Sequence, residues 1–156
     1  MEYSLDISNN SVLVHLEESL LEDLKTSYEK DKIINDDLLE SLFFIYKNPF
    51  LEVLNLIDKH DQQVINSDDK TSPEPLAAII KCEKRFIYQV KGSINYYLFD
   101  GVNFCTCSSF KYNVLHKSDY LYCKHLVMVK ILTAMNRIPT KEVKQPELSQ
   151  LIKQIQ

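Results

Sequence analysis

Four residues in the second half of the chain have the spacing of a single metal site. They form two short pairs, Cys-x-Cys and Cys-x-His, with fifteen residues between the pairs: Cys105, Cys107, Cys123 and His125. Three thiolates and one imidazole complete the tetrahedral shell of structural zinc and leave no open position for a water or a substrate. We therefore expect one structural Zn²⁺ that stabilises the fold, in a protein that binds or scaffolds and is not an enzyme.

Cysteine and histidine side chains have other uses, and these define the alternatives to the zinc site. Four cysteines can also form two disulfides. The polar, acidic start of the chain is unlike a signal peptide, so we expect the chain to stay inside the cell, where thiols remain reduced. His116 lies between the two pairs and is the alternative ligand to His125, although the polar residues after it predict an exposed turn. Cys82 stands in an apolar stretch, and we expect a packed thiol there.

Composition and motifs exclude several classes of function. A chain of 156 residues can bury one core, and with only two glycines it has no Gly-rich phosphate loop. The longest strongly apolar run, residues 42–46, is too short to span a membrane. There is no His-Glu-x-x-His pattern and no grouping of Ser, His and Asp. We expect neither a membrane segment nor a small-molecule substrate.

The hydrophobic pattern predicts an α+β fold, in which N-terminal helices precede a small antiparallel β-meander and a zinc-stapled helix. Apolar residues recur at intervals of three and four over residues 13–28, which predicts a first helix. Asp36 is the expected N-cap of a second helix over residues 37–47. Asn48 and Pro49 are the expected N-cap and first helical residue of a third helix.

The pattern changes after the third helix. Polar residues over 61–75 predict a loop, and alternation then predicts strands at 86–90, 94–99 and 102–104. A helix is expected over 121–136. The domains that we predict are a helical region (1–66), a linker (67–75), the zinc-finger module (76–138) and a C-terminal tail with a short helix (139–156).

The second predicted helix is apolar nearly all round over residues 38–46. Such a helix either lies at the centre of the protein's own core or presents an interface to a partner.

The two halves of the chain differ in charge. Residues 1–72 carry 6 Lys and Arg against 16 Asp and Glu, whereas residues 73–156 carry 12 against 6. A basic half can bind nucleic acid, and nearby tyrosines can stack on bases. The candidate phosphate contacts to single-stranded DNA are Lys111, Lys117, Lys124, Lys130 and Arg137. The alternative is that these are solvated lysines beside core tyrosines.

Cys-x-Cys followed by Cys-x-His after a β-meander resembles the SWIM zinc-finger domain. Within that class, the stretch FCTCSSFKYNVLHKSDYLYCKHL (residues 104–126) is similar to the SWIM-domain subunits of the Shu recombination complex. The segments KNPFLEVLNLIDKH (47–60) and YQVKGS (88–93) are similar too, and the resemblance covers roughly residues 38–136.

The resemblance implies a function that the spacing does not show. Such subunits pair with a RecA-like recombinase paralogue, and through it with the recombinase, and promote filament assembly in homologous recombination and double-strand break repair. It implies a nuclear protein whose zinc ligands are Cys105, Cys107, Cys123 and His125. The chain departs from the family pattern at Met128, where Ala is usual, and this departure bears on packing against the sheet or the partner.

Overall fold

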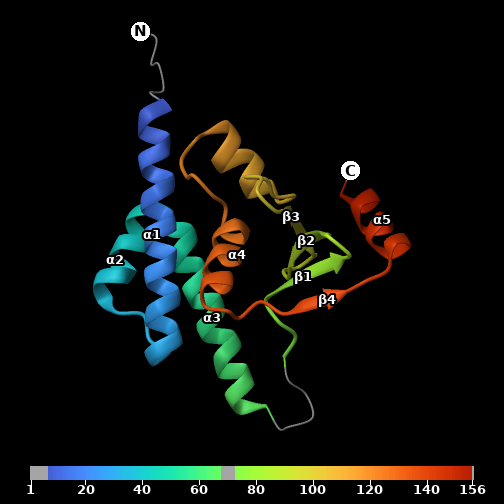
Figure 1. Cartoon of the computed structure of the whole chain (residues 1–156), viewed down its shortest axis with the longest axis horizontal. Coiled ribbons are helices and arrows are strands. Elements are labelled where there is room, and N and C mark those ends of the chain that lie inside the picture. The colour runs from blue at the N-terminus through green and yellow to red at the C-terminus, as the bar shows by residue number, and fades with distance from the viewer. Residues whose placement is uncertain (1–6, 68–72, 156) are drawn as a thin grey trace.

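The structure is a computed structural model that describes residues 7–67 and 73–155 of the chain. Three helices come first, followed by a sheet, a π-helix, a central helix and a C-terminal helix (Figure 1). Their bounds are α1 (Ile7–Asp31), α2 (Asp36–Tyr46), α3 (Asn48–Asn66), β1 (Ala77–Cys82), β2 (Arg85–Val90), β3 (Tyr96–Phe99), η1 (Phe110–His116, the π-helix), α4 (Lys124–Ala134), β4 (Thr140–Glu142) and α5 (Gln145–Gln154). The predicted α+β class is confirmed.

The sheet is mixed and has the order β3-β2-β1-β4. Strands β1, β2 and β3 form the antiparallel meander, and β4 adds to β1 in parallel. The parallel pairing begins where the Ile79 N–H donates to the Pro139 carbonyl, at 2.8 Å. The predicted tail contains β4 and α5, so the pairing of β4 with β1 joins this tail to the sheet. The predicted domain boundaries stay a prediction.

Two of the predicted strands correspond to β2 and β3, but the third is wrong. Residues 102–104 form no strand, and only an isolated bridge pairs Leu98 with Cys105. The first strand of the meander is instead β1, whose sequence AAIIKC does not alternate. Its two faces are covered, by α4 on one side and α5 on the other, and a strand buried on both faces loses the polar alternation that predicts strands.

The caps of α2 and α3 each differ from prediction by one residue, and the helix predicted over 121–136 is shorter, since α4 runs from Lys124 to Ala134. Asn35, not Asp36, caps α2, and its side-chain oxygen accepts a hydrogen bond from the Leu38 N–H at 2.8 Å. Lys47, not Asn48, precedes α3, and its φ of +57° turns the chain sharply between the two helices. The loop predicted from residue 61 begins later, because 61–66 continue α3 as a largely exposed helix end.

Helix α4 lies at the centre of the molecule, between the N-terminal helices and the sheet (Figure 1). It is apolar nearly all round, and Met128 on it is only 1% exposed. The side chain that departs from the family pattern is therefore inside the core. No helix within residues 7–67 or 73–155 has the length and apolar character needed to cross a membrane.

Helix α2 contributes to the core and also leaves apolar surface exposed. Leu42, Ile45 and Tyr46 are buried. The adjacent Phe43 and Phe44 are 40% and 65% exposed. One face of this helix therefore lies in the protein's own core, and the exposed apolar face leaves the predicted partner interface a prediction.

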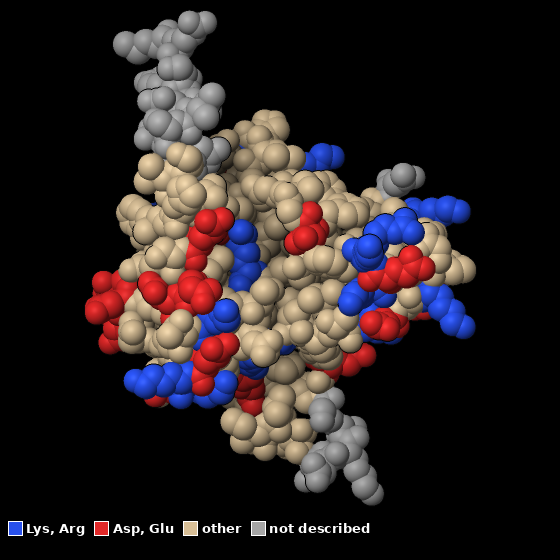
Figure 2. Space-filling model, in the orientation of Figure 1, with Lys and Arg blue, Asp and Glu red and all other residues tan. Residues whose placement is uncertain are grey.

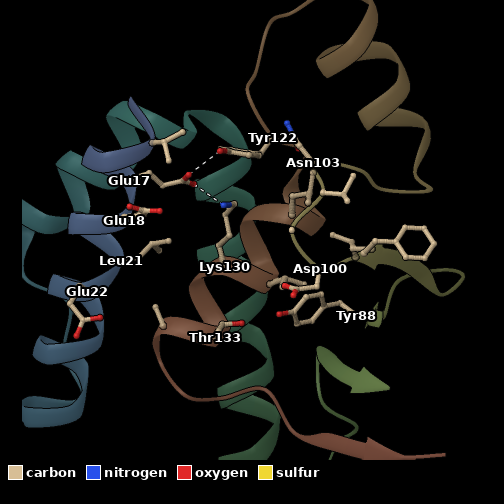
Figure 3. Close-up of a pocket in the computed structure, with 18 of the residues that line it drawn as sticks. Glu17, Glu18, Leu21, Glu22, Tyr88, Asp100, Asn103, Tyr122, Lys130 and Thr133 are labelled. Carbon is tan, nitrogen blue, oxygen red and sulfur yellow. Dashed lines mark hydrogen bonds and ion pairs between the residues drawn. The ribbon is translucent and has the colours of Figure 1, made fainter. Parts of the chain in front are cut away.

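A buried carboxylate joins α1 to α4. Glu17 is 5% exposed, and it accepts hydrogen bonds from the hydroxyls of Tyr46 (2.7 Å) and Tyr122 (2.9 Å). The Lys130 ammonium lies 3.2 Å from the same carboxylate and 4.7 Å from the centre of the Tyr122 ring. Burial, and then the charge of Glu17, raise the pKa of both phenols, so they stay protonated donors. Figure 3 shows Glu17 with its partners Tyr122 and Lys130 between the two helices.

We predict that Glu17→Ala destabilises the protein by about 3 kcal/mol, because it leaves two phenols and one ammonium without their acceptor. Glu22→Ala, on the exposed surface of the same helix, is the matched control and should change stability by less than about 0.5 kcal/mol. Urea unfolding in zinc-containing buffer measures both. Equal stability of the two variants would contradict the assigned role of Glu17.

Candidate metal centre

The structure brings the four predicted ligands together. The Sγ atoms of Cys105, Cys107 and Cys123 and a ring nitrogen of His125 all lie within 4.8 Å of one another, and all four residues are buried. Cys105 Sγ is 3.7 Å from His125 Nδ1. Around a tetrahedral zinc with bonds of about 2.3 Å to sulfur and 2.0 Å to nitrogen, neighbouring ligand atoms are roughly 3.5–3.8 Å apart. This buried group can therefore bind one zinc ion.

Two separate parts of the chain supply the ligands. Cys105 follows the turn after β3 and is held there by its bridge to Leu98. Gly101 in that turn has a φ of +68°, which favours glycine. Cys123 is the N-cap of α4, and His125 lies in its first turn. The cluster thus fixes the start of α4 against the end of the sheet.

Backbone N–H groups point at the thiol sulfurs. The Phe110 N–H donates to Cys107 Sγ at 3.2 Å. The backbone of Cys107 acts to lower the pKa of Cys105, and the backbone of Leu126 acts to lower the pKa of Cys123. Such donors, together with the N-terminal end of the α4 dipole at Cys123, favour the thiolate form that binds a metal.

The protonation state of each thiol depends on the other two, because the three sulfur atoms are so close. Hydrogen bonds from Cys105 and Cys123 lower the pKa of the Cys107 thiol. Hydrogen bonding to Cys107 and Cys123, followed by burial, raises the pKa of Cys105. Three neighbouring thiolates repel one another, so complete ionisation of the cluster requires a cation such as zinc.

Tyr96 holds the imidazole of His125 in place. The two rings stack with their centroids 4.0 Å apart and their planes at 25°. A Cβ on Gly92 would lie only 2.6 Å from a carbon of the Tyr96 ring, so the absence of a side chain at Gly92 lets this ring approach. No sequence pattern singled out Tyr96 as a support of the site.

The two alternative ligands lie outside the cluster. His116 is exposed at the end of η1. Cys82 is buried in β1 and packs in the second core, under α5, with its Sγ 3.5 Å from Gln145 Oε1. It is the packed thiol that the sequence predicts.

Three of the five candidate DNA contacts face carboxylates. Lys124 lies 3.0 Å from Glu52, Lys130 reaches Glu17, and Arg137 forms a two-pronged pair with Asp61. The other two, Lys111 and Lys117, are exposed on and beside η1. Figure 2 shows Lys and Arg side chains interspersed with Asp and Glu over one face of the molecule.

Comparison with known proteins agrees with this geometry. The family model described as SWIM zinc finger matches residues 98–133, which include all four cluster residues. No solved structure matches the chain significantly. The fold and site together define a SWIM zinc-finger protein.

Curated relatives match over nearly the whole chain. Zinc finger SWIM domain-containing protein 7 of Danio rerio is 30% identical over 144 residues, covering 91% of this chain and 93% of the relative. The protein of the same name from Homo sapiens is 27% identical and covers 90% and 92%. A homologue from Dictyostelium discoideum is 29% identical over 131 residues, covering 81% of this chain and 72% of the relative. The chain belongs to the family of zinc finger SWIM domain-containing protein 7.

We predict that Cys105→Ser abolishes stable zinc binding and unfolds the module, because zinc binding in small domains contributes on the order of 10–16 kcal/mol. Cys82→Ser is the matched control, since it replaces a buried cysteine outside the cluster, and it should leave the zinc content unchanged. Zinc released by mild oxidation, measured with a colorimetric chelator, tests both variants. A Cys105→Ser protein that retains stoichiometric zinc would contradict the ligand assignment.

Proposed function

We propose that this chain is a non-enzymatic, zinc-stabilised adaptor of a Shu-type complex. In this proposal it pairs with a RecA-like recombinase paralogue in the nucleus and promotes recombinase filament assembly in homologous recombination and double-strand break repair. Support comes from its membership of the SWIM family and from the resemblance of residues 104–126 to Shu-complex subunits. A filled shell of four protein ligands supports a structural and not a catalytic metal.

The pair of exposed phenylalanines on α2 is the observation that carries the adaptor proposal. Phe44 lines a groove with Leu16 and Leu20 of α1, with a volume of about 450 Å³. Leu51 on α3 is also exposed, at 51%. Apolar surface of this kind is typical of a protein–protein interface, in which a few aromatic side chains contribute most of the binding free energy.

We predict that Phe44→Asp weakens binding to the RecA-like paralogue by at least about tenfold, because loss of an aromatic anchor costs about 2 kcal/mol or more. Val64→Asp, at an exposed apolar position near the end of α3, is the control and should bind normally. Co-expression followed by affinity purification and titration calorimetry gives the measurement. Normal binding by a folded Phe44→Asp protein would place the interface elsewhere.

Direct binding of single-stranded DNA is the second candidate function. One observation favours it. Lys111, Lys117 and Tyr112 are all exposed on the segment between the two ligand pairs, residues 108–122. The Lys117 ammonium lies 4.7 Å from the centre of the Tyr112 ring, so a cation and an aromatic face are presented together.

If this second function holds, Lys111→Glu with Lys117→Glu should weaken binding to a fluorescent oligothymidylate and reduce its salt dependence by roughly 0.7 per lysine in log–log slope. Lys59→Glu with Lys84→Glu makes the same change in charge at exposed positions away from η1. Fluorescence anisotropy at several salt concentrations measures the DNA affinity of both double variants. Equal losses in both double variants would show that no local DNA site exists.

A further inference from the structure

A second groove, larger than the one beside Phe44, lies on another face of α1. It has a volume of about 900 Å³ and is bounded by α1, by α4 and by the chain around β3 and its following turn. Figure 3 looks into this groove and shows α1 on one side and Tyr88, Asp100 and Asn103 on the other. The Glu17 cluster ties α1 to α4 within it.

The floor of the groove is apolar beside the Glu17 cluster, which lines the same groove. Leu98 of β3, with Leu126 and Val129 of α4, lies at the bottom, and all three are buried. Val14 of α1 and Val102 after the β3 turn line it too and are 42% and 55% exposed. A concave surface with an apolar floor and exposed apolar side chains at its edges favours burial of a partner's apolar side chain.

The rim of the groove is acidic on both sides. Glu18 and Glu22 lie on the α1 side, and Asp100 lies on the opposite side (Figure 3). The cations in the groove are already engaged, since Lys25 is 3.3 Å from Glu22 and Lys130 pairs with Glu17. Asp100 has no ion-pair partner within residues 7–67 and 73–155, and its charge reaches Tyr88, whose pKa is raised by burial and then by Asp100.

We infer that this groove binds a peptide segment of a partner protein in which an apolar side chain is flanked by lysine or arginine. The apolar side chain occupies the floor formed by Leu98, Leu126 and Val129. The cation lies between Asp100 and the carboxylates of α1. The acidic rim repels a phosphate backbone, so charge complementarity favours a basic peptide over nucleic acid.

This inference is independent of the proposed adaptor interface. Glu18, Glu22 and Lys25 are spaced by three and four residues and share one face of α1, whereas Leu16 and Leu20 share another. The two grooves therefore present separate surfaces. Failure of either one leaves the other testable.

The test is selection from a random 12-residue peptide library displayed on phage against the zinc-loaded full chain. Enriched peptides are synthesised, and their affinities are measured by fluorescence anisotropy. We expect an enriched motif with Lys or Arg within three residues of Leu, Ile or Phe. The groove variant is Glu18→Lys with Asp100→Lys, and it should weaken these peptides by at least about tenfold at low salt.

Matched controls separate the groove from the overall charge. Asp23→Lys with Asp58→Lys makes the same change in net charge at exposed positions of α1 and α3 outside the groove, and it should weaken binding by less than about twofold. Phe44→Asp should have no effect on these peptides. Val102→Ser tests the apolar edge without adding charge. It should weaken these peptides, and the loss of affinity should depend less on salt than the loss in the charge-reversal variant.

Three results would overturn the inference. They are the failure to enrich any peptide, the enrichment of peptides without a basic residue, and equal loss of affinity in the groove and control variants. A fourth result would also overturn it: displacement of an enriched peptide by an oligothymidylate would assign the groove to nucleic acid.

Discussion

The convergence of three thiols and one imidazole on a single point is the constraint on which the rest of this structure depends. The sheet side contributes Cys105 and Cys107, and the start of α4 contributes Cys123 and His125. Structural zinc contributes on the order of 10–16 kcal/mol in small domains, and whole domains are stable by only about 5–15 kcal/mol. The ion and the fold are therefore expected to be lost together.

Fixing the start of α4 has consequences well beyond the cluster. Helix α4 is the centre of the main core and contacts α1, α3 and two strands. Tyr122 directly precedes the ligand Cys123, and its hydroxyl donates a hydrogen bond to Glu17 of α1. This one residue therefore links the position of the ligand pair to the position of α1. Helix α1 in turn forms one wall of each groove. The zinc site thus supports both grooves through α4 and α1, although none of its four ligands lines either groove.

The sequence predicts best the features whose cause is local. Ligand spacing and the caps of α2 and α3 depend on a few neighbouring residues. The four predicted ligands do lie together, and both caps were wrong by one position. Strand β1 was missed because both of its faces are covered, and β4 because three exposed residues, Thr140 to Glu142, owe their strand conformation to the edge of β1. The burial of Glu17 has no local signal in the sequence, since only the tertiary fold brings Tyr46, Tyr122 and Lys130 to it.

Native mass spectrometry of the freshly purified chain, before and after a strong chelator, tests the central claim most directly. The account predicts one zinc per chain before chelation, and loss of that zinc together with the tertiary signals of the folded protein in near-ultraviolet circular dichroism. A chain that carries no metal when folded, or that keeps these signals after its metal has been removed, would contradict it.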